Sequence, residues 1–252
     1  MPSITDQFIA VIGGSSGIGF AVAKLALKEG ARVAIVSSNL ARVETAVDEL
    51  KKEVEDGHRV TGHVCDLKGD DVEHRLDKVF VEIVHANDGN LLDHIVFTAG
   101  DKLAVKPLKE IDINFIREAG QVRFEAPLLI AKLAPRFVKS QYSSSLVLTT
   151  GSACDKPVVN YTVAASYFSG LRAMTRNLAV ELKPIRVNRV SSGAVNTELW
   201  GPNREEILRE FSQTTFMGRV ASAEEVAESY IYLMKDTNAT GSTVSTDGGV
   251  LL

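Results

Sequence analysis

Short apolar runs alternate with longer amphipathic segments from one end of the chain to the other. In the longer segments apolar side chains recur at helical spacing, as in Val72, Leu76, Val79, Phe80 and Ile83. These segments predict helices at about 20–28, 40–54, 70–86, 111–119, 122–137, 163–181, 205–213 and 223–235. The apolar runs are rich in β-branched residues and predict strands at 8–12, 31–37, 60–66, 92–98, 144–150, 185–190 and 241–247.

The regular alternation of strands and helices indicates the fold class. Unbroken apolar strands are typical of a parallel sheet that is buried on both faces. We therefore expect an α/β doubly wound fold, with a seven-stranded parallel sheet, helices on both faces and ligands at the carboxyl ends of the strands. No internal repeat, low-complexity tract or linker divides the sequence. Residues 1–252 are predicted to form a single domain, with the polar insert at about 197–218 as a small helical lid. Ser222 and Glu225 predict a capping box at the start of the last helix.

The turn between the first strand and the first helix has the composition of a dinucleotide-binding loop. Gly13, Gly17 and Gly19 permit a sharp turn and the close approach of a pyrophosphate, which the helix N–H groups and dipole would attract. An ordinary strand-to-helix turn also contains glycine, but the strand–turn–helix context favours a Rossmann-type nucleotide site. The loop residues predicted to contact the cofactor are Gly13, Ser15, Ser16, Gly17, Ile18 and Gly19.

Composition and charge exclude several classes of partner. The net charge is -4, so nothing suggests nucleic acid or an anionic membrane as a ligand. No apolar run approaches the roughly 20 residues of a membrane span, and residues 1–7 contain no signal-peptide pattern. Cys65 and Cys154 are too few and too scattered for a disulfide framework or a zinc site. We expect a cytoplasmic protein with no metal and a small-molecule substrate.

The residues after the second strand bear on which nucleotide binds. An NAD enzyme needs a carboxylate there to accept hydrogen bonds from the ribose 2′-OH. This chain has Ser37, Ser38 and Asn39 instead, with Arg42 one helical turn later. Hydroxyl, amide and guanidinium groups can donate to a 2′-phosphate, and no acid repels it. We therefore expect NADP(H) rather than NAD, while the Ser-Ser-Asn sequence is equally suited to cap the following helix.

Further motifs resemble those of the short-chain dehydrogenase/reductase family and occur in the same order along the chain. The glycine loop has the family's spacing, and Asp66 resembles its residue that binds the adenine amino group. Thr98-Ala99-Gly100 resembles its Asn-Ala-Gly turn, 185–188 and 192–197 resemble the segments that hold the nicotinamide, and 247–249 match its C-terminal Asp-Gly-Gly. The resemblance implies a nicotinamide cofactor and a homodimer or homotetramer that pairs through the helices at 122–137 and 163–181. It adds these residues to the predicted cofactor site: Asp66, Leu67, Ala99, Gly100, Arg123, Val195 and Thr197.

The family's usual proton-transfer residues have no counterpart here. Aligning 171–182 with the family's helix places Ala164 at its tyrosine and Phe168 at its lysine, and no tyrosine in the chain is followed by lysine four residues later. The family's serine position falls near Thr150 or Gly151. Alanine and phenylalanine cannot transfer protons, and acid–base catalysis typically contributes roughly 10²–10⁴-fold. Ordinary alcohol dehydrogenation is therefore not expected.

Three polar residues are the predicted catalytic groups. Arg123 aligns with the family's helix asparagine, and its planar guanidinium could donate to a substrate carbonyl or to the nicotinamide carboxamide. Asp101 follows the fourth strand and Asp155 follows the fifth. The alternatives are a surface arginine, a loop-capping aspartate and a solvated pair of Asp155 with Lys156.

Three functions remain open. The first is a reductase of an imine/iminium or activated carbonyl that works without the usual residues: an iminium carbon is already electrophilic, so a hydride from NADPH suffices, and the protein has only to position the substrate and stabilise its cation. The pocket could instead promote a cyclisation, or the chain could bind NADP(H) without catalysis. Tyr161 and Trp200 are predicted to line the pocket in each case.

Segments 94–101, 122–127 and 148–151 resemble a divergent group of short-chain reductases of fungal secondary metabolism. Members without the tyrosine and lysine include NADPH-dependent imine reductases that also act as Diels–Alderases in indole alkaloid pathways. The resemblance implies an atypical NADP-dependent oxidoreductase in specialised-metabolite biosynthesis, in which Arg123 matters. That group also uses an aspartate after the fifth strand, in a motif that 158–162 do not contain.

Overall fold

The computed structural model of the chain describes residues 2–54 and 57–252. Three residues lie outside this description: Met1, and residues 55 and 56. The first belongs to the segment 1–7, in which no signal-peptide pattern is found, and the other two belong to the predicted domain. The strands are β1 Phe8–Ile12, β2 Arg32–Ser37, β3 Val60–Val64, β4 His94–Phe97, β5 Ser145–Gly151, β6 Arg186–Ser192, β7 Val195–Asn196, β8 Ala221–Ser222 and β9 Thr243–Thr246. The helices are α1 Gly17–Lys28, α2 Leu40–Lys51, α3 Val72–Ala86, α4 Ile113–Gly120, α5 Ala126–Phe137, α6 Thr162–Glu181, α7 Arg204–Ser212 and α8 Ala223–Lys235.

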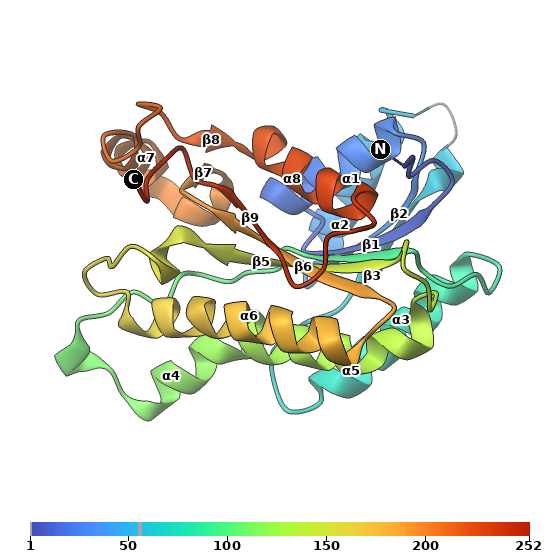
Figure 1. The fold of residues 1–252 in the computed structure, drawn as a ribbon, viewed down its shortest axis with the longest axis horizontal. Helices are drawn as coiled ribbons and strands as arrows, with labels where there is room; N and C mark the ends of the chain where they lie inside the picture. The colour runs from blue at the N-terminus through green and yellow to red at the C-terminus, as the bar shows by residue number, and fades with distance from the viewer. Residues whose placement is uncertain (1, 55–56) are drawn as a thin grey trace.

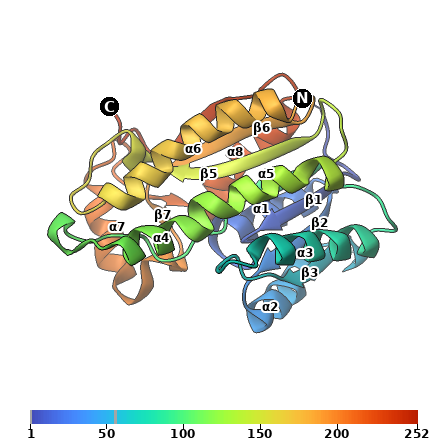
Figure 2. The same cartoon turned by 90° about the horizontal axis from the view of Figure 1, so that it is seen from below.

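The predicted doubly wound α/β fold is confirmed. In the described residues, strands pair in parallel in a seven-stranded sheet of order β3-β2-β1-β4-β5-β6-β9. Helices α1 and α8 lie on one face, and α5 and α6 lie on the other (Figure 1). Viewed from the second face, α3, α5 and α6 run across the sheet in one layer (Figure 2). The order reverses direction between β1 and β4, and ligands of open α/β sheets bind at such a switch point.

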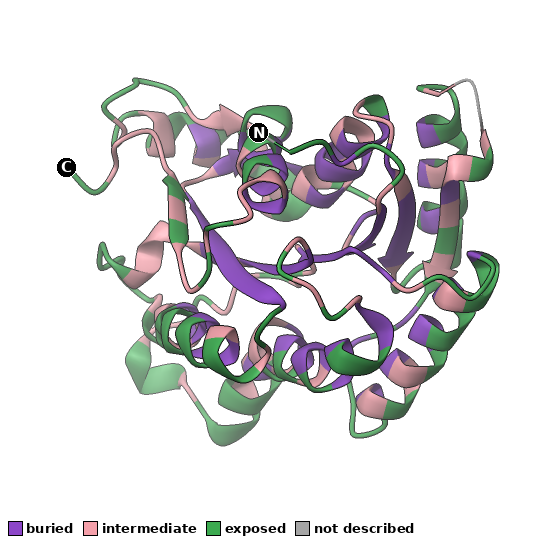
Figure 3. Cartoon of the chain, turned by 45° about the vertical axis from the view of Figure 1, so that its right-hand side comes forward, coloured by how far each residue is buried: buried purple, intermediate pink, exposed green. Residues whose placement is uncertain are grey.

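Alternation along the strands supplies a core to each face. In β1, Ile9 and Val11 pack into the core beneath α1 and α8, whereas Phe8, Ala10 and Ile12 pack into the core beneath α3, α5 and α6. The inner strands β1, β2, β4, β5 and β6 are therefore buried through most of their length, as the purple ribbons in Figure 3 show, whereas the edge strands β3 and β9 are partly exposed. This burial on both faces explains why the strands read as apolar runs rather than as alternating patterns.

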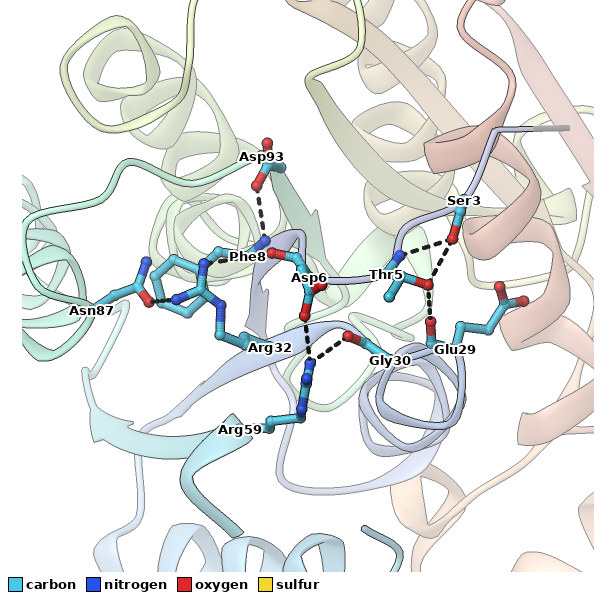
Figure 4. Close-up of polar contacts among 10 residues, drawn as sticks. All are labelled: Ser3, Thr5, Asp6, Phe8, Glu29, Gly30, Arg32, Arg59, Asn87 and Asp93. Carbon is cyan, nitrogen blue, oxygen red and sulfur yellow. Dashed lines mark hydrogen bonds and ion pairs between the residues drawn. The ribbon is translucent and has the colours of Figure 1, made fainter. Parts of the chain in front are cut away.

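Polar contacts tie together the edge of the sheet from which β1 starts (Figure 4). The Phe8 amide donates to Asp93 Oδ2 at 2.9 Å. Arg59 Nη1 donates to the Gly30 carbonyl at 2.6 Å and to Asp6 Oδ1 at 3.1 Å. These contacts connect the segments that lead into β1, β2, β3 and β4. They therefore hold the amino ends of these strands together, at the end of the sheet opposite to the carboxyl ends.

A π-helical turn at Gln121–Glu125 joins α4 to α5, where the sequence predicts the start of a regular helix. The amide of Ala126 donates to the carbonyl of Gln121, five residues earlier. Pro127 explains the widened turn, because it has no N–H for the carbonyl of Arg123 and its ring crowds that carbonyl. Such turns inside α-helices are frequent at functional sites.

The segment after β6 contains structure that the sequence pattern did not predict. β7 and β8 pair as a two-residue parallel ladder, too short to produce a periodic signal. A 3₁₀ segment, Glu198–Asn203, and α7 follow β7. Ser222 and Glu225 form the predicted capping box at the start of α8, in which each side chain bonds the other residue's backbone amide.

Candidate functional site

A cavity of about 1280 Å³ opens at the carboxyl ends of the strands. Its walls come from the loops after β1 to β6 and from the segment between β7 and β8. Most of the sequence-predicted site residues meet in this one cavity; Asn39 and Asp155 are the two that do not line it. The predicted residues that line it are Gly13, Ser15, Ser16, Gly17, Ile18, Gly19, Ser37, Ser38, Asp66, Leu67, Ala99, Gly100, Asp101, Arg123, Val195 and Thr197.

The glycine turn is packed too closely to admit side chains. A Cβ built at Gly13 would lie 2.5 Å from the Ala99 amide nitrogen, and one at Gly19 would lie 2.2 Å from the Gly13 carbonyl oxygen. Gly13 and Gly17 also have positive φ angles of 92° and 52°, which residues with a Cβ rarely adopt. The turn therefore brings the end of β1, the start of α1 and the loop after β4 together.

The amino end of α1 fits an anionic ligand. Ser16 is its N-cap, but the Ser16 side chain makes no capping hydrogen bond, and the first turn holds no acidic residue. Asn39, Asp112 and Ser222 cap α2, α4 and α8 with their side chains, whereas α3, α6 and α7 share with α1 the lack of a side-chain cap. The leading amides of α1 and its dipole thus face the cavity, an arrangement suited to the pyrophosphate of a dinucleotide.

The end of β2 presents hydroxyls and a cation to the cavity. Ser37 Oγ lies 2.8 Å from Ser15 Oγ, and Ser38 and Arg42 also line this part of the wall. Asn39 is outside the lining because its Oδ1 accepts from the Arg42 amide at 3.0 Å, so its side chain caps α2. Of the Ser-Ser-Asn sequence, Asn39 thus caps the following helix, whereas Ser37 and Ser38 line the cavity.

Arg123 projects from the π-helical turn against the loop after β4. Its Nη2 donates to the Asp101 carbonyl, and its Nε lies 3.4 Å from Asp101 Oδ1. The guanidinium carbon is 5.7 Å from the centre of the Phe168 ring, and both terminal nitrogens would be 2.8 Å from a Cβ at Gly100. Burial lowers the pKa of Arg123 and the Asp101 carboxylate opposes this shift, so the group stays a cation.

Asp101 also bridges to the loop after β3. Lys68 Nζ lies 3.4 Å from Asp101 Oδ2, and Lys68 lines the cavity. One carboxylate is thus shared between two cations, and the three side chains together leave one positive charge at this wall. Lys68 was not predicted, because strands β3 and β4 are separated by two others in the sheet and sequence alone does not bring their loops together.

Helix α6 carries the two residues that align in sequence with the family's tyrosine and lysine, Ala164 and Phe168. Ala164 is buried and does not line the cavity, whereas Phe168 does. Thr150 Oγ1 donates to the Phe168 carbonyl at 3.2 Å and fixes α6 to β5. Tyr161 lines the cavity, and burial raises the pKa of its phenol. No lysine contact lowers that pKa, so Tyr161 stays a neutral donor at physiological pH.

The structure places Asp155 outside the cavity. Its carboxylate accepts from Cys154 Sγ at 3.1 Å and from Arg172 Nη1 at 3.3 Å. Asp155 therefore pairs with Arg172 of α6. The alternative interpretation had paired it with Lys156. Lys156 Nζ instead donates to the Val250 carbonyl near the carboxyl terminus, at 2.9 Å.

The 3₁₀ segment after β7 contributes a wall that sequence reasoning found only in part. Trp200 lines the cavity as predicted, and Phe211 of α7 packs against it. Glu198 was missed: its Oε2 would lie 3.9 Å from a Cβ at Gly17, so it borders the glycine turn. Thr197 meets the same glycine, and this contact fixes the segment beside α1.

Known proteins are similar to this chain in both fold and sequence. Residues 3–252 match the SDR-like Rossmann domain, the domain of short-chain dehydrogenases/reductases. The chain is 43% identical over 255 residues to the short-chain dehydrogenase/reductase ATR9 of Stachybotrys chlorohalonatus, with 100% of both chains covered. It is 40% identical over 252 residues to fsr5 of Gibberella fujikuroi, which covers 97% of this chain and 94% of that protein. The solved structure of MalC reductase/Diels-Alderase from Malbranchea aurantiaca matches it with a TM-score of 0.91 and 36% identity, over 98% of this chain and 97% of that one.

The chain therefore belongs to the short-chain dehydrogenase/reductase family, and its class is that of an oxidoreductase with a nicotinamide cofactor. Within the described ranges, no helix combines the length and apolarity needed to cross a bilayer.

Proposed function

We propose that this chain binds NADP(H) in the cavity and reduces a C=N bond, or an activated C=O bond, of an intermediate in specialised-metabolite biosynthesis, an alkaloid in particular. The observation that carries the proposal is a glycine turn suited to a dinucleotide that shares one cavity with a largely buried arginine, in a sequence that has no Tyr-x-x-x-Lys motif. Relatives named as fungal short-chain reductases, among them one named a reductase/Diels-Alderase, support the metabolic setting.

The preference for NADP(H) rests on the end of β2. Ser38 and Arg42 line the cavity there, and the Ser-Ser-Asn stretch offers no carboxylate to a ribose 2′-OH. A 2′-phosphate would find hydroxyl and guanidinium donors and would meet no acidic residue from β2.

The residues of the cavity divide the remaining work. The bound cofactor would supply the hydride. The amides at the start of α1 would hold the pyrophosphate, and Asp66 would contact the adenine. Arg123 would donate through its guanidinium to a carbonyl oxygen of the substrate or to the carboxamide, with Asp101 holding it in place. The segment 197–218 would act as a lid that excludes water from this space.

The test is NADPH consumption with a cyclic imine such as dihydroisoquinoline, compared with NADH. Wild-type protein should consume NADPH with the imine and reduce cyclohexanone far more slowly, because no tyrosine in the chain is followed by lysine four residues later to protonate an unactivated ketone. Arg123→Ala should lower kcat/KM by about 10²-fold, the usual cost of one transition-state donor. Arg117→Ala removes an exposed arginine from the neighbouring helix α4 and is the matched control. Full activity of Arg123→Ala would remove Arg123 from the site.

A cyclase activity is the second candidate, and the MalC similarity is the observation that favours it. In that case the cavity would hold a reactive diene and dienophile in one geometry, which requires orientation rather than proton transfer. Product formed without NADPH consumption would support this function over reduction. Binding of NADPH with neither reaction would indicate the third candidate, a non-catalytic NADP-binding protein.

We also propose that the chain forms homodimers or homotetramers through α5 and α6. Leu128 of α5 and Val180 of α6 are 40% and 68% exposed, as expected for residues that a second copy would cover. Light scattering coupled to size-exclusion chromatography tests this, and a monomer at micromolar concentration would contradict it.

A further inference from the structure

One wall of the cavity is aromatic and aliphatic, and it is separate from the nucleotide cradle. The cradle is built at the ends of β1, β2 and β3, whereas this wall comes from the loop after β5 and the segment that includes α7. Figures 1 and 2 both show α7 well apart from α2 and β3. The residues that form this wall are Val158, Val159, Leu199, Trp200, Ile207 and Phe211.

Trp200 is held rigidly in the wall. Its Nε1 donates to the Val195 carbonyl at 2.7 Å, and its ring lies 5.2 Å from the Phe211 ring at an interplanar angle of 45°. The following Gly201 has φ 67° and ψ −152°, a conformation that is essentially limited to glycine. Because its only polar hydrogen is already bonded to the backbone, the indole offers a ligand only its apolar ring.

The wall does not belong to the folding core. Neither of the two apolar clusters that cover the faces of the sheet includes Trp200 or Phe211. Leu199 and Val159 in the same wall are 42% and 83% exposed. Large apolar side chains that face a cavity opening instead of a core are typical of a ligand-binding surface.

We infer that Trp200, supported by Phe211, is a stacking platform for a planar and largely apolar ring system of the ligand. This inference rests on the proposed function, and it names the chemical class of that function's substrate. A flat ring would cover the indole face and displace water from Val159 and Leu199, while Arg123 supplies a charged donor for an acceptor atom on the same molecule. Aromatic pairs in offset-stacked or tilted contact gain more than their buried area alone provides, so a planar ring should bind better here than a saturated ring of the same size.

The sequence contains one tryptophan, so tryptophan emission reports on this wall alone. The probes are β-naphthol and its saturated counterpart decahydro-β-naphthol, which share a carbon skeleton and a hydroxyl and differ in planarity. Calorimetric titration of the full chain with NADP present should give β-naphthol the lower Kd by about three- to tenfold. The same additions of β-naphthol should quench Trp200 emission.

The Trp200→Leu variant keeps apolar volume but removes the aromatic face, so the preference for the planar probe should disappear. Trp200→Phe should retain part of it. Tyr142→Leu alters an aromatic residue that is 69% exposed and does not line the cavity, and it should behave as the wild type. If Trp200→Leu does not fold, Phe211→Leu tests the same platform with the indole in place.

Equal affinities for the two probes, failure of β-naphthol to bind, or a preference that survives in both variants would overturn the inference. So would binding that leaves the tryptophan emission unchanged. None of these readouts needs turnover, so they are distinct from a failure of the proposed reductase, which would show as absent NADPH consumption with the platform intact.

Discussion

The guanidinium of Arg123 is confined on the side of Gly100. A methyl group at Gly100 would lie 2.8 Å from both terminal nitrogens, so the guanidinium must move away from the cavity wall. Since misplacement of a positioning group by about 1 Å can cost roughly 10²-fold in rate, we expect Gly100→Ala to lower the turnover of an imine by at least tenfold. The measurement is steady-state NADPH consumption.

Gly57→Ala is the matched control for this substitution. Among the described residues, the nearest atom to its new methyl group would be in the Lys51 side chain at 3.6 Å, and Gly57 does not line the cavity. Wild-type turnover in Gly100→Ala would mean that the position of the guanidinium does not matter for the reaction.

Glu198 places a negative charge beside the amino end of α1. Its carboxylate borders Gly17, where the phosphates of a dinucleotide would bind. A like charge opposes the binding of an anion there, so Glu198→Gln should tighten NADPH binding by about two- to fivefold, the scale of one charge at a helix terminus. Energy transfer from Trp200 to NADPH measures the Kd. Glu206→Gln, an exposed acid of α7 outside the cavity, should leave the Kd unchanged, and a weaker Kd in Glu198→Gln would show that the carboxylate assists binding.

At the scale of single elements, the π-helical turn couples a proline to the position of Arg123. With alanine at position 127, the amide regained could donate to the Arg123 carbonyl and close a regular α-helical turn. We expect Pro127→Ala to fold with equal or higher thermal stability and to lose most of its activity, because the register of Arg123 changes.

Pro135→Ala in the same helix gives the comparison, since Pro135 is exposed and lies two turns away. It should retain wild-type activity. Thermal melts and NADPH consumption for the two variants separate stability from positioning, and an active Pro127→Ala would contradict the link between this turn and the site.

The elements that sequence predicts and those it misses differ in their physical cause. Buried parallel strands and amphipathic helices imprint their period on the sequence, so the sheet and the helices were predicted to within a few residues. The π-helical turn depends on one missing N–H, and the β7–β8 ladder on two residues in each strand. Neither produces a periodic signal, and the first of them sets the position of Arg123.

At the scale of the whole molecule, the reversal of strand order between β1 and β4 creates the site. It sets the glycine turn against Ala99, so that a Cβ at Gly13 would touch that residue's backbone. Spacing and composition predict the residues of the proposed nucleotide cradle, and most of these line one cavity because they follow strands directly. They did not foretell the Lys68–Asp101–Arg123 cluster or the contact of Thr197 with Gly17, because these join segments that only the folded sheet brings together. Asp155 was misplaced for the same reason, since its partner Arg172 is on α6.

A bound dinucleotide would contact both halves of the sheet, and it should therefore stabilise the whole fold. Binding to the native state alone adds about 2.7 kcal/mol at a ligand concentration of 100 times Kd, which for a chain of this size raises Tm by roughly 5–10 °C. NADP should produce this shift at a concentration where NAD produces much less, because Ser38 and Arg42 are available to the 2′-phosphate. Arg42→Ala should reduce the difference between the two nucleotides, whereas Lys51→Ala, which removes an exposed cation from the far end of α2, should preserve it. Equal shifts with NAD and NADP would contradict the proposed preference for NADP, but they would still support dinucleotide binding at the start of α1.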